Sequence, residues 1–362
     1  MEDISVNNSV LTVNSIFHNY KVNFDLKNSF INKKLRENTF FVIIDKKVEK
    51  LYANQLRWMD DAKEIIKIEA IEKNKDINKV KSVSKNLLQN GINKNDVIVV
   101  IGGGIIQDVS AFTANIIKRG VKWYFIPTTL LAMCDSCIGS KVGINMSGFK
   151  NQLGVFWPPS EIFIDINFLR TLNKKEIVSG IGEIIKVHLI SGNTDFSNLE
   201  KGYDNFIDNY ENLNPFIFKS LEIKKKIVEK DEFDLHHRHI LNYGHTFGHA
   251  IEAYTNNTIP HGIAVSIGMN IANYVSLNKG YISHKEYDRM ESTIKKNIIY
   301  DSLDFSDLNK MGDLLKTDKK YDGSFLKVIL TKGIGKIIID RINVDKSLLG
   351  LINDYADKFN SA

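Results

Sequence analysis

Short apolar runs alternate with helical patterns in the first half of the chain. The runs, rich in β-branched and aromatic residues, are 40–44, 96–101, 122–126 and 162–164. Segment 81–89 between the first two runs has the 3.6-residue spacing of a helix. Because continuous apolar runs are typical of strands buried on both faces, this half predicts a Rossmann-like α/β domain. Ligands of such open, mostly parallel sheets bind at the carboxyl ends of the strands.

Helical spacing replaces the strand pattern after about residue 173. The clearest helical segments are 174–191, 215–230, 240–255 and 264–279, and 326–331 is a possible small strand. We therefore expect an all-α C-terminal domain, with the chain divided into residues 1–172 and 173–362.

A glycine turn follows the second apolar run. Residues 96–101 lead directly into Gly102, Gly103 and Gly104, and a helix is expected from there to about residue 118. A strand, a glycine turn and a helix can present backbone N–H groups to a phosphate, as in dinucleotide-binding proteins. Gln107 occupies the third glycine position of the full fingerprint, so the turn alone is equally consistent with a purely structural role.

A histidine-rich segment lies in the second half. His245 and His249 are four residues apart and share a helix face with Glu252, and His261 begins the next apolar run. Three imidazoles and a carboxylate are suitable ligands for a divalent metal. The alternative is a surface or core rich in histidine. Thr246 excludes the His-Glu-x-x-His pattern of metalloproteases.

Composition indicates an ordinary globular protein. The 362 residues are 43% apolar and 25% charged, with 48 Lys and Arg against 43 Asp and Glu, a net charge of +5 without a basic block. This charge favours anionic small molecules over nucleic acid. With neither a signal-peptide pattern nor an apolar run of membrane-spanning length, we expect a cytoplasmic enzyme that does not bind membranes. Cys134 and Cys137 are expected to be small buried residues, because one C-x-x-C pair makes a poor zinc site.

These features together resemble the dehydroquinate synthase family, the NAD- and zinc-dependent sugar phosphate cyclases. The resemblance extends from about Asp45 to Gly335. Its motifs, in chain order, are Gly102-Gly-Gly-Ile-Ile-Gln-Asp108, Arg119-Gly120, Pro127-Thr-Thr-Leu-Leu131, Asp135-Ser136 with Lys141, Lys150-Asn151, Gly182-Glu183-Ile-Ile-Lys186, Leu241-Asn-Tyr-Gly-His245-Thr-Phe-Gly-His249-Ala250, His261-Gly262 and Asp318-Lys-Lys320.

The resemblance implies a role for each of these residues. The metal, zinc or another divalent ion such as cobalt, would be bound by Glu183, His245 and His261, with His249 handling protons or contacting phosphate. The other residues implied in catalysis are Arg119, Asp135, Lys141, Asn151, Lys186, Lys224, Arg238 and Asn242. The positions implied to bind NAD are Asp45, Glu72, Lys75, Gly103, Gly104, Ile105, Asp108, Thr128, Thr129, Lys141 and Lys150. The N-terminal domain would thus bind NAD, and the C-terminal domain the metal and substrate.

The reaction implied is redox-neutral overall. An alcohol of a seven-carbon sugar phosphate is oxidised, phosphate is eliminated, the ketone is reduced, and an aldol step closes the ring. For this family the substrate is 3-deoxy-arabino-heptulosonate 7-phosphate and the product 3-dehydroquinate, an intermediate of the shikimate pathway to aromatic amino acids. A homodimer is also implied.

Departures from the family pattern leave other substrates open. Gln107 and Ser140 stand where glycine is usual, and Ile263 replaces a glutamate. One alternative is a cyclase for sedoheptulose 7-phosphate or an amino analogue. A second is a metal-dependent polyol or glycerol-phosphate dehydrogenase. Such an enzyme should not need the catalytic lysines Lys141, Lys186 and Lys224. A non-catalytic homologue would be expected to lack Glu183, His245 or His261, and all three are present.

Overall fold

The computed structural model describes residues 10–24, 33–36 and 38–361. The chain forms two compact units, the first from Met1–Leu172 with Asn209–Asp234 and the second from Asn173–Asp208 with Leu235–Ala362. A single boundary after residue 172 therefore does not separate the two units. The segment Asn209–Asp234, which carries a helix, returns to the first unit.

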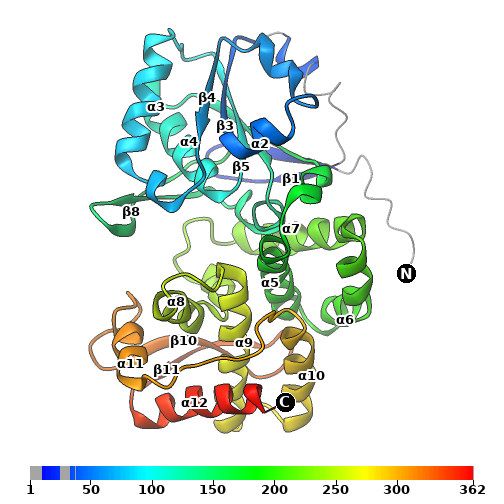
Figure 1. Cartoon of the computed structure of the whole chain (residues 1–362), viewed down its shortest axis with the longest axis vertical. Coiled ribbons are helices and arrows are strands. Elements are labelled where there is room, and N and C mark those ends of the chain that lie inside the picture. Colours follow the sequence, from blue (N-terminus) through cyan, green and yellow to red (C-terminus); the bar gives the residue numbers. More distant parts are fainter. Residues whose placement is uncertain (1–9, 25–32, 37, 362) are drawn as a thin grey trace. The chain divides into compact units, whose positions relative to one another are not determined.

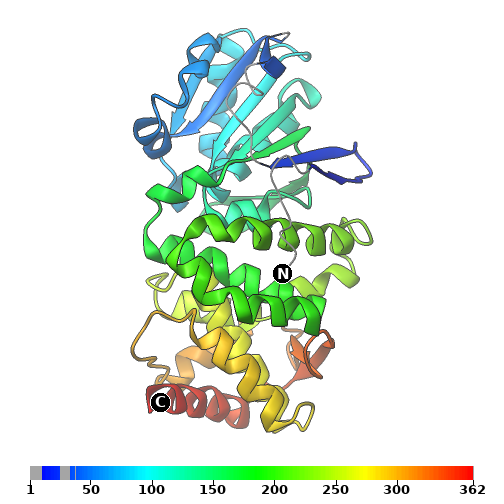
Figure 2. The ribbon, with the colours of Figure 1, turned by 90° about the vertical axis from the view of Figure 1, so that its right-hand side faces the viewer.

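A seven-stranded sheet forms the centre of the first unit (Figure 1). Its spatial order is β1-β2-β9-β6-β5-β3-β4, and every neighbouring pair is parallel except β1 and β2. The strands are β1 (Val10–Val13), β2 (Tyr20–Phe24), β3 (Phe40–Asp45), β4 (Glu64–Ile68), β5 (Val97–Gly102), β6 (Lys122–Pro127) and β9 (Glu161–Ile164). The four predicted apolar runs correspond to β3, β5, β6 and β9, which confirms the α/β sheet. Figure 2 shows β1 and β2 as a hairpin that projects from the edge of this sheet.

Helices and one further hairpin complete the first unit. The α-helices are α2 (Lys46–Leu51), α3 (Ile77–Gln89), α4 (Gly104–Ile116) and α7 (Asn214–Val228). The hairpin consists of β7 (Lys141–Met146) and β8 (Phe149–Phe156), and its first strand contacts α4. Short 3-10 or π turns are η1 (Arg57–Asp61), η2 (Glu72–Asn74), η3 (Ile117–Arg119), η4 (Ala132–Ser136), η5 (Ile166–Thr171) and η6 (Tyr210–Leu213). The hairpin was not predicted, because its residues are mostly polar or exposed.

Helix α9 lies at the centre of the second unit. It contacts α5, α8, α10, α12 and β10, and nearly all of its residues are buried. The elements are α5 (Lys174–Ser191), α6 (Asn193–Asp208), η7 (His237–Asn242), α8 (His245–Tyr254), α9 (His261–Asn278), α10 (His284–Lys295), α11 (Leu308–Lys316), α12 (Lys346–Asn360) and the antiparallel strands β10 (Leu326–Thr331) and β11 (Ile337–Ile342). The helical character and the small strand at 326–331 are confirmed. None of the described helices has the length and apolarity to cross a membrane.

The helix expected over residues 240–255 is interrupted. Helical turn η7 ends at Asn242, and α8 begins at His245 after Gly244, whose φ is +78°. A Cβ at Gly244 would lie 2.6 Å from the carbonyl oxygen of Val265 on α9. Glycine is therefore required at this bend both for its backbone conformation and for the close approach of α9.

Paired glycines also bring α5 and α9 into backbone contact. A Cβ at Gly262 would lie 1.7 Å from the carbonyl oxygen of Ser179, and a Cβ at Gly182 would lie 2.1 Å from that of Gly262. No other residue type fits there without separating the helices. Gly182 precedes Glu183 and Gly262 follows His261, so this crossing holds the carboxylate and the imidazole side by side.

Candidate metal and substrate site

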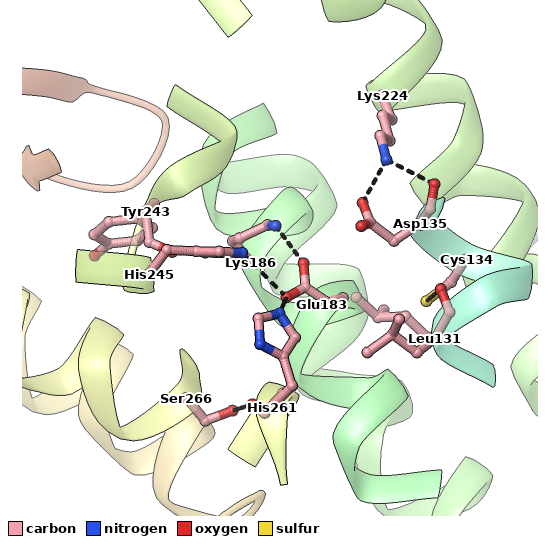
Figure 3. A network of polar contacts seen from close by, with 12 residues as sticks. Leu131, Cys134, Asp135, Glu183, Lys186, Lys224, Tyr243, His245, His261 and Ser266 are labelled. Carbon is pink, nitrogen blue, oxygen red and sulfur yellow. Dashed lines mark hydrogen bonds and ion pairs between the residues drawn. The ribbon is translucent and has the colours of Figure 1, made fainter. Parts of the chain in front are cut away.

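Glu183, His245 and His261 converge within the second unit. Oε1 of Glu183 lies 3.7 Å from Nε2 of His245 and 3.5 Å from Nε2 of His261. One potential ligand atom from each of the three residues lies within 4.8 Å of the others. They come from α5 and the first residues of α8 and α9. Figure 3 shows Lys186 and His261 directed at the carboxylate.

Charge keeps the Glu183 carboxylate ionised. Burial raises its pKa, but the Lys186 ammonium and His261 outweigh this and lower the pKa to about 2. Lys186, one helical turn further along α5, forms an ion pair with Oε2 of Glu183. Desolvation and the neighbouring cationic groups lower the pKa of His245 well below its usual value. His245 is therefore neutral at neutral pH, the form in which an imidazole binds a metal.

The three groups fit a divalent cation. Oε1 of Glu183 is buried and faces the two imidazole nitrogens at 3.5 and 3.7 Å, and the side chain is only 1% exposed. An imidazole nitrogen lone pair facing a carboxylate oxygen is repulsive unless a proton or a cation lies between them. One carboxylate and two imidazoles form a ligand set of catalytic zinc sites, which keep a further position for water or substrate.

His249 and Glu252 lie beside His261. The His249 ring is 5.3 Å from that of His245 and 5.9 Å from that of His261, measured between centroids. Oε2 of Glu252 lies 3.2 Å from Nδ1 of His261. His249, Glu252 and His261 also form a possible ligand set. Nδ1 of His261 faces Glu252, and Nε2 faces Glu183. If the metal is bound by the set with Glu183, Glu252 is left to orient the His261 imidazole.

Further cationic and amide side chains lie in the second unit. Arg238, 6% exposed, and Asn242 are on η7, which contacts α5. Lys320, absent from the residues expected at the site, donates to Oγ1 of Thr246 at 3.1 Å, and its charge contributes to the lowered pKa of His245. The Asp318-Lys-Lys320 motif could have identified it.

In the first unit, three strand ends lie side by side at the glycine turn. β3, β5 and β6 are adjacent and end at Asp45, Gly102 and Pro127. The Thr128 N–H donates to the Gly102 carbonyl at 3.0 Å. Thr129 packs against Gly103, and a Cβ at Gly103 would lie 2.9 Å from the methyl carbon of Thr129. These positions lie at the carboxyl edge of the sheet, where ligands bind in open α/β folds.

This edge has the features of a phosphate-binding turn. Helix α4 starts at Gly104 with no side chain capping its N–H groups, and a Cβ at Gly104 would meet nothing within 4 Å. Ile105 follows in the first turn, and Asp45 caps α2 by accepting from the Lys47 N–H at 2.9 Å. Uncapped N–H groups and bare backbone fit the pyrophosphate of a dinucleotide.

An ion pair anchors the β7–β8 hairpin beside the same helix. Lys75 Nζ lies 2.6 Å from Asp108, which also accepts from the Gly143 N–H at 3.2 Å. Burial raises the pKa of Asp108 in spite of Lys75. Glu72 accepts from the Asn145 side chain at 2.7 Å. The Asn145 N–H donates to the Lys75 carbonyl at 2.9 Å, so Asn145 connects Glu72 to the Lys75–Asp108 pair.

Asp135 and Lys224 form a second ion pair in the first unit. Lys224 on α7 is 5% exposed, and its Nζ lies 2.9 Å from Oδ1 of Asp135 and 2.6 Å from the carbonyl oxygen of Asp135 (Figure 3). Cys134 and Cys137 beside them are buried and not disulfide-bonded, and burial raises the pKa of Cys137 to about 12. The expectation of small, buried cysteines is confirmed.

The remaining site residues of the first unit are more exposed. Lys141 is 50% exposed and pairs with Asp234 at 2.5 Å. The Asn151 N–H donates to the Asn145 side chain at 2.9 Å, and Lys150 beside it is exposed on β8. Arg119 is exposed and has a positive φ of 58°.

Profiles of two family domains match the chain. The 3-dehydroquinate synthase N-terminal profile matches residues 65–179, and the C-terminal profile matches residues 180–321. A 3-dehydroquinate synthase of Dictyoglomus thermophilum is 37% identical over 325 residues, which cover 88% of this chain and 90% of that protein.

Two solved structures share the fold. A 2-deoxy-scyllo-inosose synthase complexed with carbaglucose-6-phosphate, NAD+ and Co2+ matches with a TM-score of 0.86 at 22% identity, covering 96% of this chain and 99% of that one. A 2-epi-5-epi-valiolone synthase from Streptomyces hygroscopicus, with NAD+ and Zn2+ bound, matches with a TM-score of 0.80 at 23% identity, covering 94% and 97%. At these identities the likeness establishes the fold.

Proposed function

The chain belongs to the 3-dehydroquinate synthase family, and on that premise we propose that it is a sugar phosphate cyclase. The proposed reaction converts 3-deoxy-arabino-heptulosonate 7-phosphate into 3-dehydroquinate and inorganic phosphate. The observation that carries the proposal is the convergence of Glu183, His245 and His261 around one position suited to a divalent cation.

Each unit supplies one part of the proposed chemistry. Glu183, His245 and His261 would hold zinc or cobalt, and Gly103, Gly104 and the groups around them would hold NAD. When bound, the metal supplies a Lewis acid for an alcohol oxygen and NAD supplies a hydride acceptor that is restored in each turnover. The reaction is then redox-neutral, and phosphate is its leaving group.

The chain's own side chains bind and orient the substrate in this proposal. Arg238, a guanidinium fork, suits the substrate carboxylate, whereas lysine ammonium groups suit the phosphate as point charges. Lys224 is the strongest phosphate-binding candidate, because its ammonium is buried and held by Asp135. His249 lies close enough to both metal-facing imidazoles to exchange protons with a bound substrate. Arg119, Lys141 and Asn151 would contribute from exposed positions.

We also propose a cytoplasmic homodimer. Both follow from the family resemblance, and light scattering of the purified protein measures the mass directly. A mass near 41.2 kDa would indicate a monomer and would contradict the dimer.

A panel of substrates tests the function. The purified protein is incubated with NAD, zinc and 3-deoxy-arabino-heptulosonate 7-phosphate, and phosphate and NADH are measured together. Sedoheptulose 7-phosphate and a polyol are assayed in parallel. We expect phosphate release without net NADH from the first substrate.

The other outcomes separate the alternatives. Phosphate release from sedoheptulose 7-phosphate but not from the first substrate would indicate a different cyclase reaction. NADH accumulation from the polyol without phosphate would contradict the cyclase and favour a dehydrogenase.

A further inference from the structure

Gln107 forms two hydrogen bonds with one residue of the neighbouring turn. Its Nε2 donates to the carbonyl oxygen of Ser136 at 2.7 Å, and its Oε1 accepts from the hydroxyl of Ser136 at 2.7 Å. Gln107 is 6% exposed, so both bonds lie where water competes little. A glycine at this position could form neither bond.

Ser136 is adjacent to the buried ion pair. Asp135 and Ser136 are the last two residues of η4, and Asp135 contacts Lys224 with its carboxylate and its carbonyl oxygen. Gln107 fixes the carbonyl and the side chain of Ser136, and thereby restricts rotation of the peptide that follows Ser136, the neighbour of Asp135. The other end of Gln107 is in the first turn of α4, where its N–H donates to the Gly103 carbonyl at 2.9 Å.

We propose that Gln107 is a positioning residue for the sugar phosphate, acting through Ser136 on the Asp135–Lys224 ion pair. This inference rests on the proposed function. The side chain couples the glycine turn to the phosphate-binding lysine with two bonds that form only if η4 has this orientation. Its loss leaves Asp135 and Lys224 in place but less restricted.

Steady-state kinetics of Gln107→Leu tests the proposal. Leucine has similar size but cannot form the two bonds. Because small displacements of a binding group reduce rates strongly, kcat/KM for the sugar phosphate should fall about 10- to 100-fold. KM for NAD and the zinc Kd should change less than about twofold.

Ser136→Ala and the double variant supply a second measurement. Ser136→Ala removes one of the two bonds and should reduce kcat/KM by about 3- to 10-fold. Since both changes break the same contact, the double variant should match Gln107→Leu within about twofold. Thr113→Val is the matched control on α4, because its hydroxyl donates to the Val109 carbonyl of its own helix.

Three results would overturn the inference. If the wild type is active and Gln107→Leu has the same sugar phosphate kinetics, the inference is refuted while the proposed function stands. A rise confined to KM for NAD would also refute it and assign Gln107 to the glycine turn. A wild type inactive on every sugar phosphate would refute the proposed function, and this inference with it.

Discussion

Nδ1 of His261 lies 3.2 Å from Oε2 of Glu252, on the side of the imidazole opposite Glu183. A carboxylate in this position accepts a hydrogen bond from Nδ1–H, which leaves the lone pair of Nε2 for the proposed metal. Carboxylates behind metal-binding histidines set the tautomer and raise the basicity of the ring. We therefore expect Glu252 to orient the imidazole of His261 and not to bind the metal.

Glu252→Gln should weaken metal binding. The amide lacks the negative charge that favours the Nδ1–H tautomer, and loss of such a partner costs about 10- to 100-fold in affinity. Competition with a chelator gives the zinc Kd of the wild type and the variant. Asp313→Asn, at an exposed position of α11, is the control and should leave the Kd unchanged. Equal affinities in Glu252→Gln and wild type would contradict the role of Glu252.

Metal binding should release protons at neutral pH. Desolvation lowers the pKa of His261, but the hydrogen bonds and charges of Glu183 and Glu252 outweigh it and raise the pKa to about 10. Below that pH the metal-free imidazole carries a proton that a cation must displace, so affinity rises with pH. Calorimetry in buffers of different ionisation enthalpy should give about one proton released per metal at pH 7. Uptake of a proton, or no exchange, would argue against His261 as a ligand.

The Gly182–Gly262 contact should be necessary for both stability and metal binding. A Cβ at Gly262 would overlap the Ser179 carbonyl, so Gly262→Ala must separate α5 from α9 and should cost about 3 kcal/mol or more in the free energy of unfolding. Gly350→Ala is the control, because a Cβ there meets nothing within 4 Å and alanine favours the α12 helix by about 0.5 to 1 kcal/mol. Chemical denaturation measures the free energy of unfolding of both variants. A Gly262→Ala protein as stable as the wild type would contradict the close crossing.

Lys224→Met should impair use of the sugar phosphate. The change removes the ammonium and leaves the Asp135 carboxylate without its cation, so kcat/KM should fall about 100-fold or more. Lys219→Met on the same helix breaks a more exposed pair with Glu222 and should change kcat/KM less than about twofold. Comparable losses in both variants would indicate a general effect of charge.

The glycine turn and the strands around it could be predicted from the chain because their signals are local. An apolar run that ends in Gly102 is sufficient to predict β5, the turn and α4. The metal group could not be derived from spacing. His245 and His249 have the spacing of a shared helix face. The carboxylate that His245 faces, however, is that of Glu183 on α5, and helices α6 and α7 separate the two residues in the sequence. Only the family resemblance had suggested Glu183.

Contacts between distant segments account for the other residues that were missed. Gln107 was noticed as a departure from a motif, but its partner Ser136 is 29 residues away, and nothing in the sequence indicates that a turn after β6 meets the first turn of α4. The return of α7 to the first unit was likewise not encoded locally, because its apolar spacing would suit a helix in either unit.

Isotope retention distinguishes a redox-neutral cyclase from a dehydrogenase. The sugar phosphate is deuterated at the carbon whose alcohol is oxidised, and the product is analysed by mass spectrometry with phosphate and NADH measured in parallel. We expect one phosphate per product, deuterium kept at that carbon and no net NADH. Loss of the deuterium to accumulated NADH, without phosphate release, would contradict the cyclase and indicate a dehydrogenase.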